Sequence, residues 1–151
     1  MAEIKISDLS VGDWIATESA QLAIECNDIA TAFVDKVKKP IQIVSVLGAE
    51  QLVFGRIEEL DGFTTIYLKA EHIKPIPLTT EILEKNGLCV VEEEADFSEY
   101  ELFGSENFSI FHLKGTFHYR LETPQASVVC WCVHQLQNAL RLAGVEKEIE
   151  V

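Results

Sequence analysis

Apolar and polar residues alternate over short stretches in the first half of the chain, with enough β-branched and aromatic residues to favour strands. Four such stretches are predicted strands: Trp14–Thr17, Ile41–Leu47, Leu52–Glu58 and Phe63–Lys69. Asp61–Gly62 separates the last two and predicts a two-residue hairpin turn, which would place Ile57 opposite Ile66. The pattern is typical of a small curled sheet or barrel.

Residues 19–38 follow a different period. Apolar residues recur there at steps of three and four, as on one face of a helix: Leu22, Cys26, Ile29, Phe33 and Val37. Ser19 is a candidate N-cap and Pro40 ends the segment. A pair of strands remains the alternative, because the segment is also rich in β-branched residues.

The middle of the chain contains clear signals for where helices begin and end. Pro75 and Pro77 exclude a helix and predict an extended connector. Thr79 then fits the N-cap of a short helix that Gly87 closes. We expect Leu88–Glu92 to be a strand, followed by an acidic loop.

A second hairpin is predicted from Phe108–Leu113 and Thr116–Leu121, with Lys114–Gly115 as its turn. In that register His112 opposes Phe117 and His118 opposes Phe111. The two histidines would then project from opposite faces of the sheet, which argues against a metal ion shared between them.

The stretch VVCWCVHQLQNAL (Val128–Leu140) changes period midway. Its first half is continuously apolar, like a buried strand, and from about residue 132 a helical face begins that we expect to continue to about 143. His134 would lie at the start of this helix, near the surface, with Gln137 on the outer face. Glu148–Val151 is a candidate last strand.

These elements predict an α+β protein. Residues 1–78 would form a β-rich, SH3-like or small-barrel subdomain. Residues 79–151 would add the short helix and an antiparallel sheet packed by the helix at about 132–143.

Charge narrows the function classes. The chain of 151 residues has 12 basic and 25 acidic side chains, a net charge of −13, and 48% hydrophobic residues. This balance disfavours direct binding to nucleic-acid phosphates or anionic membranes and permits a basic protein partner. The acids concentrate after residue 80, and the candidate interaction residues among them are Glu92, Glu93, Glu94, Asp96, Glu99 and Glu101. A solvated, solubilising face is the alternative interpretation.

Thiols and imidazoles offer the only other candidate chemistry. Cys130, Cys132 and His134 could form a zinc site or a nucleophile–base pair, but the spacing lacks the Cys-x2-4-Cys pairs of structural zinc. We favour a buried junction between strand and helix, with thiols and imidazoles on separate surfaces. The four cysteines form no disulfide framework, and the N-terminal residues lack an apolar leader, so we expect a cytoplasmic protein with reduced thiols. No cofactor motif is recognised.

Two segments carry a family resemblance: HIKPIPLTTEILEKNGL (His72–Leu88) and VHQLQNALRLAGVEKEIEV (Val133–Val151). Together with SVGDWI (Ser10–Ile15) they resemble small proteins of gut bacteria and their phages or mobile elements, a family without an assigned activity. The resemblance implies an accessory protein encoded by such an element and no catalytic residues. The chain departs from the family pattern by an insertion at about residues 17–39.

The sequence therefore predicts a non-catalytic, acidic interaction protein. His134 and Gln135 could add a polar contact surface to the acidic residues. Two alternatives stay open: a mimic of the DNA surface that inhibits a nucleic-acid-binding protein, and a cysteine-dependent hydrolase that uses Cys130 or Cys132 with His134 or His112.

Overall fold

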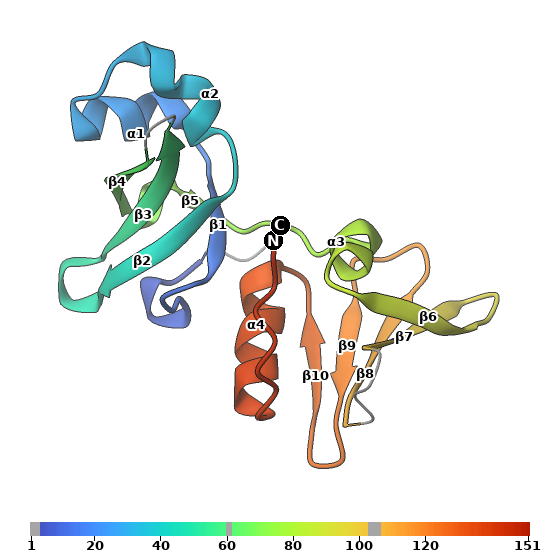
Figure 1. Cartoon of the computed structure of the whole chain (residues 1–151). Coiled ribbons are helices and arrows are strands. Elements are labelled where there is room, and N and C mark those ends of the chain that lie inside the picture. The colour runs from blue at the N-terminus through green and yellow to red at the C-terminus, as the bar shows by residue number, and fades with distance from the viewer. Residues whose placement is uncertain (1–3, 60–61, 103–106) are drawn as a thin grey trace. The chain divides into compact units, whose positions relative to one another are not determined.

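The chain has an α+β fold that divides into two compact units, residues 1–76 and 77–151 (Figure 1). This computed structural model describes residues 4–59, 62–102 and 107–151. Each unit contains one five-stranded sheet in which every strand pair is antiparallel. None of the described helices combines the length and the apolar composition needed to cross a bilayer.

The sheet of the first unit is a curled half-barrel with strand order β4-β3-β2-β1-β5. Its strands are β1 (Trp14–Thr17), β2 (Ile41–Leu47), β3 (Leu52–Glu59), β4 (Gly62–Lys69) and β5 (Ile73–Lys74). Short 3-10 helices lie at Ile6–Asp8, Thr31–Phe33, Gly48–Glu50 and Ala70–His72. The core consists of inward-facing aliphatic side chains, among them Ile15, Ile41, Ile43, Ile66 and Leu68, all at most 1% exposed.

The first hairpin forms, but in another register. Glu59 pairs with Gly62 and Gly55 pairs with Ile66, a shift of two residues from the prediction. A shift of two keeps every side chain on its predicted face, so Ile57 and Ile66 are both buried. Asp61 of the predicted turn and its neighbour Leu60 lie outside the described residues.

Residues 19–38 are helical, as predicted, but the helix is broken. α1 (Ala20–Asn27) ends at Asp28, whose φ of 53° is left-handed, and α2 (Val34–Val37) follows after a 3-10 turn. Ser19 caps α1 by accepting the Leu22 N–H at 3.3 Å. Asn27 fixes the end of α1, because its amide bonds both the Tyr67 N–H and the Tyr67 carbonyl. Within α1 the buried residues are Ala23 and Ile24, and Leu22, predicted on the apolar face, is 37% exposed.

The second unit contains an open sheet with strand order β10-β9-β8-β7-β6. Its elements are α3 (Thr80–Lys85), β6 (Leu88–Glu93), β7 (Phe97–Leu102), β8 (Ser109–Leu113), β9 (Tyr119–Glu122), β10 (Ser127–Cys130) and α4 (Val133–Leu142). The predicted caps of α3 are confirmed: Thr79 accepts the Ile82 N–H at 3.3 Å, and Gly87 follows with a φ of +82°. Leu78 N–H donates to the Trp131 carbonyl, so the start of the unit pairs with the junction before α4.

The prediction of an acidic loop after Leu88–Glu92 is wrong. The segment is not a loop: Phe97–Leu102 forms β7, with Ser98 and Tyr100 buried and Glu99 and Glu101 on the opposite face. Alternation along a strand explains how the two glutamates coexist with a buried face. Residues 103–106 of this segment lie outside the described residues.

The second hairpin is also shifted by two residues. His112 pairs with Tyr119 and Phe111 pairs with Arg120, and a longer turn is closed by the Leu113 N–H to His118 carbonyl bond of 3.2 Å. Phe117 therefore lies in the turn, 76% exposed, and not on the sheet as predicted. The prediction that His112 and His118 face opposite ways is confirmed, since His112 stacks on buried Tyr119 and His118 stacks on exposed Trp131.

Candidate functional site

The outer face of the second sheet gathers the exposed aromatic and charged side chains of that unit. One cross-strand row, one residue from each strand, follows from the register: Glu92, Glu99, Phe111, Arg120 and Val129. We call this set the outer row. It begins with two carboxylates, passes through a phenyl ring and a guanidinium, and ends at a valine that is 50% exposed.

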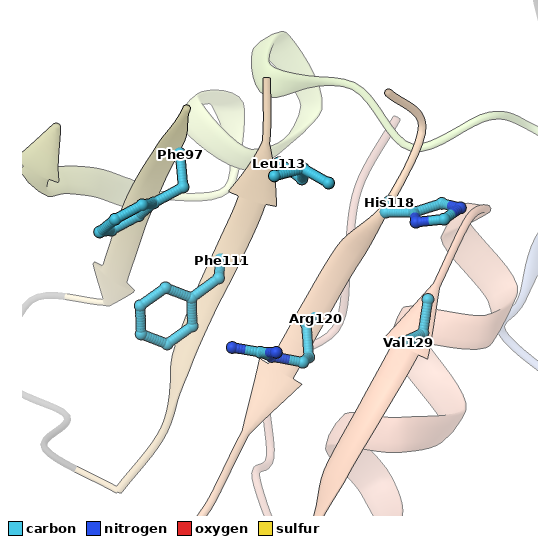
Figure 2. Close-up of a pocket in the computed structure, with 6 residues that line it drawn as sticks. All are labelled: Phe97, Phe111, Leu113, His118, Arg120 and Val129. Carbon is cyan, nitrogen blue, oxygen red and sulfur yellow. The ribbon is translucent and has the colours of Figure 1, made fainter. Parts of the chain in front are cut away.

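Beside the outer row lies a shallow depression of about 360 Å³, shown in Figure 2. Three residues of the row contribute to its lining, together with three neighbours; the six are Phe97, Phe111, Leu113, His118, Arg120 and Val129. Their side chains all rise from the same face of β7–β10 in the figure. The surface is mainly apolar, with one guanidinium and one imidazole at its edge.

Contacts between these side chains give the depression a defined shape. The rings of Phe97 and Phe111 lie 6.1 Å apart and tilted by 52°, a favourable aromatic arrangement. The Arg120 guanidinium lies 5.5 Å from the centre of the Phe111 ring, and its Nε donates to Glu122 Oε1 at 2.7 Å. These contacts hold Arg120 across the sheet face, between the Phe111 ring and Glu122.

Two glutamates are cross-strand partners at the end of the outer row. Glu92 on β6 is the direct cross-strand partner of Glu99 on β7. Directly opposed like charges destabilise a sheet. The other acids of the segment do not form such a pair. Glu93 forms an ion pair with Lys114 at 3.0 Å, and Glu101 accepts a hydrogen bond from Ser109 at 3.5 Å. Glu94 and Asp96 are exposed near the β6–β7 turn.

His134 and Gln135 do not form the polar contact surface considered above. His134 is 4% exposed, so the prediction that it lies near the surface is wrong. Gln135 is exposed, but its Oε1 accepts the Trp131 N–H at 2.8 Å and so satisfies the backbone where α4 begins. Gln137, predicted on the outer face, is also buried.

One thiol and one imidazole touch in the second unit. Cys132 Sγ lies 3.5 Å from His134 Nδ1, contrary to the expectation that these groups lie on separate surfaces. Burial raises the pKa of Cys132 to about 11 and that of neighbouring Cys130 to about 12. Because the nucleophile in cysteine catalysis is the thiolate, both residues are suited to packing and not to attack on a substrate.

A second thiol–imidazole pair was missed in the sequence, since Cys26 and His72 are far apart along the chain. Cys26 Sγ lies 3.7 Å from Nε2 of the fully buried His72. His72 Nδ1 accepts the Lys69 N–H at 3.0 Å, so in the neutral ring Nε2 carries the proton. A general base would need that nitrogen free to take the thiol proton, and burial lowers the pKa of His72. The pair therefore holds the 70–72 turn in place.

Metal ligation gains no support from the described residues. Within ranges 4–59, 62–102 and 107–151, no three His, Cys, Asp or Glu side chains are grouped to hold an ion.

The aromatic lining of the depression was not recognised in the sequence. The signal that could have found it is the composition of Ser109–Leu113, where apolar residues occupy both alternating sets of positions. A strand of an open sheet with one covered face needs only one such set, so the second set marks an apolar outer surface.

Searches against protein-family models, curated proteins and solved structures give no match for this chain.

Proposed function

We propose that this protein is a non-catalytic interaction module that binds a basic partner on the outer face of its second sheet. The observation that carries the proposal is the outer row, which places two opposed carboxylates beside an exposed aromatic depression. In line with the sequence resemblance, we further propose a cytoplasmic accessory role encoded by a phage or mobile element.

The apolar part of this surface supports partner binding. Leu113, Val129 and Trp131 are 46%, 50% and 42% exposed and lie on or beside the depression. Contiguous exposed apolar side chains with a polar rim mark interaction sites, and aromatic residues contribute most to binding energy there. Because the side chains stand on paired strands, little order is lost on binding.

The acidic residues of this surface indicate that the partner carries positive charge. Glu92 and Glu99 repel one another in the free protein, and a lysine or arginine placed between them would remove that repulsion. The complementary ligand is a protein segment in which a large apolar side chain is flanked by basic residues. The same pairing of features disfavours the DNA-mimic hypothesis, because phosphate mimicry does not require an aromatic depression.

A labelled synthetic peptide with one tryptophan between lysines is the first probe. We expect binding that weakens as salt rises from 50 to 300 mM, and that is lost in peptides with alanine for tryptophan or glutamate for lysine. Phe111→Ala weakens binding by about tenfold or more, whereas the control Phe117→Ala, an exposed ring in the turn, leaves it unchanged.

Charge reversal tests the other half of the surface. Glu99→Lys weakens the binding of the basic peptide and reduces the dependence of that binding on salt. Glu50→Lys, which changes an exposed acid of the first unit, has a smaller effect. Equal binding by wild type, Phe111→Ala and Glu99→Lys would contradict the proposal. A protein ligand that duplex DNA displaces and that ignores Phe111→Ala would favour the DNA-mimic alternative.

A further inference from the structure

Residues 145–151 have the side-chain pattern of a strand without belonging to a sheet. Along this segment Val145, Lys147 and Val151 are partly buried and Ile149 is 1% exposed, while the three intervening glutamates are exposed. In Figure 1 the segment runs back along α4 after the helix ends. The predicted strand at Glu148–Val151 is therefore extended but has no strand partner in the described chain.

Two side-chain amides take the place of that strand partner. Gln137 on α4 donates to the Lys147 carbonyl at 2.9 Å and accepts the Ile149 N–H at 2.6 Å. Asn86, which follows α3, donates to the Glu150 carbonyl and accepts the Glu150 N–H at 2.7 and 2.8 Å. Both side chains are buried, and each amide makes two hydrogen bonds to the backbone of residues 147–150.

Two cations complete the contact in a protein with few of them. Lys85 donates to the Val151 carbonyl at 2.8 Å, and Arg141 pairs with Glu148 at 3.4 Å. We call Lys85, Asn86, Gln137 and Arg141 the tail-binding site. Its chemistry selects an extended peptide with an aliphatic anchor and acidic flanks.

The segment is joined to α4 through Gly144, and the Val145 N–H donates to the Leu140 carbonyl at 2.9 Å, which ends the helix. Gly144 has a φ of +75° and an exposed position with no atom within 4 Å of where a Cβ would lie. The contacts on the far side of it are hydrogen bonds to backbone, one ion pair and one buried side chain. Such contacts are those of a bound peptide and do not depend on the peptide belonging to the same chain.

We infer that the tail-binding site is a receptor for an extended acidic peptide with an aliphatic anchor, filled in this chain by its own residues 145–151 and open to exchange. This site shares no residue with the outer row, so it goes beyond the proposed function. The chemistry of the ligand is given by the segment itself: VEKEIEV.

The test uses the full chain with a specific protease site inserted between Gly144 and Val145, so that the protein folds intact before it is cut. A labelled VEKEIEV peptide is then added to cut and uncut protein. We expect the peptide to enter the cut protein and to bind the uncut protein at least about a hundredfold more weakly, because a tethered segment competes at high effective concentration.

Variants separate recognition from unspecific adhesion. The Ile149→Asp peptide and the Gln137→Leu protein each weaken exchange by about tenfold or more. Phe111→Ala on the outer face leaves exchange unchanged, so failure here and failure of the proposed function are distinguishable.

Three results would overturn the inference. They are no exchange after a day at 37 °C, equal entry of the Ile149→Asp peptide, and loss of the folded amide spectrum on cutting that excess peptide does not restore. The last result would make residues 145–151 an inseparable part of the core.

Discussion

Glu92 and Glu99 are direct cross-strand partners on the outer face of the second sheet, although each carries a carboxylate. Next to this pair the same face presents Phe111 and, one strand further, Arg120. An arrangement that weakens the sheet locally is expected where a surface serves binding more than folding.

Neutralising one member of this pair is expected to stabilise the protein. Glu99→Gln raises the free energy of unfolding by about 0.5 kcal/mol at low salt, because it removes the opposed charge while keeping the side-chain shape. Chemical denaturation at 50 mM and 1 M salt measures the gain, which shrinks at the higher concentration. Glu50→Gln is the control, and an equal gain at both salt concentrations would contradict the electrostatic explanation.

Gly55 is required by a close approach inside the first sheet. A Cβ at this position would lie 2.3 Å from Ile41 Cγ2, and the rigid strands leave little room for adjustment. Gly55→Ala is expected to destabilise the first unit by about 2 kcal/mol. Gly48→Ala is a matched control, because no atom lies within 4 Å of its would-be Cβ. Thermal unfolding of both variants decides the point, and equal melting temperatures would count against the steric argument.

The buried thiols of the second unit are expected to react slowly. With a pKa of about 11, Cys132 is about 0.1% thiolate at pH 8, and Cys130 is less ionised still. Alkylation followed by peptide mass spectrometry ranks the reaction rates of the four cysteines, and we expect the exposed Cys89 to react first. Fast modification of Cys132 in the folded protein would revive the hydrolase hypothesis.

The lowered pKa of His72 predicts that the protein loses stability in mild acid. Burial is the main cause that lowers the pKa of His72, with Lys69 adding to it and Glu71 opposing it. The unfolded chain therefore takes up this proton at a higher pH than the folded chain does. Stability from the neutral ring is complete above about pH 6.5 and is lost as the pH falls through the lower folded pKa.

Comparing two variants isolates that contribution. His72→Gln keeps a hydrogen-bond acceptor for Lys69 but removes the titrating ring, so its unfolding free energy changes less between pH 7 and 5.5 than that of wild type. His118→Gln, which removes an exposed imidazole from the second unit, is the matched control. Parallel slopes for wild type and His72→Gln would assign the acid sensitivity to other groups.

Local signals in the sequence predict the elements but not their registers. The caps Ser19, Thr79 and Gly87 act over three or four residues, and all three lie where the pattern places them. Both hairpins are shifted by two residues, because the side-chain alternation that locates a strand is the same in either register.

Burial of single polar residues depends on segments that are distant in the sequence. Gln137 belongs to the polar side of an isolated α4, yet residues 145–151 cover it and use its amide. Phe111 belongs to a strand with apolar residues in both alternating sets, so the sequence does not decide which set is buried; in the structure Ile110 is buried and Phe111 is partly exposed. Of the candidate residues named from the sequence, Glu92 and Glu99 lie in the outer row, whereas its aromatic residue and the rest of the depression were missed.

The bond between Asn86 and Glu150 spans 64 residues and joins the beginning of the second unit to its last described residues. On a ribosome, the first unit has all of its strands once residue 76 has left the exit tunnel. The second unit must wait until synthesis has passed residue 150 before its α3 region is complete. Until then the buried amides of Asn86 and Gln137 lack their backbone partners, so translation products that end before residue 145 are expected to be less stable in this half of the molecule.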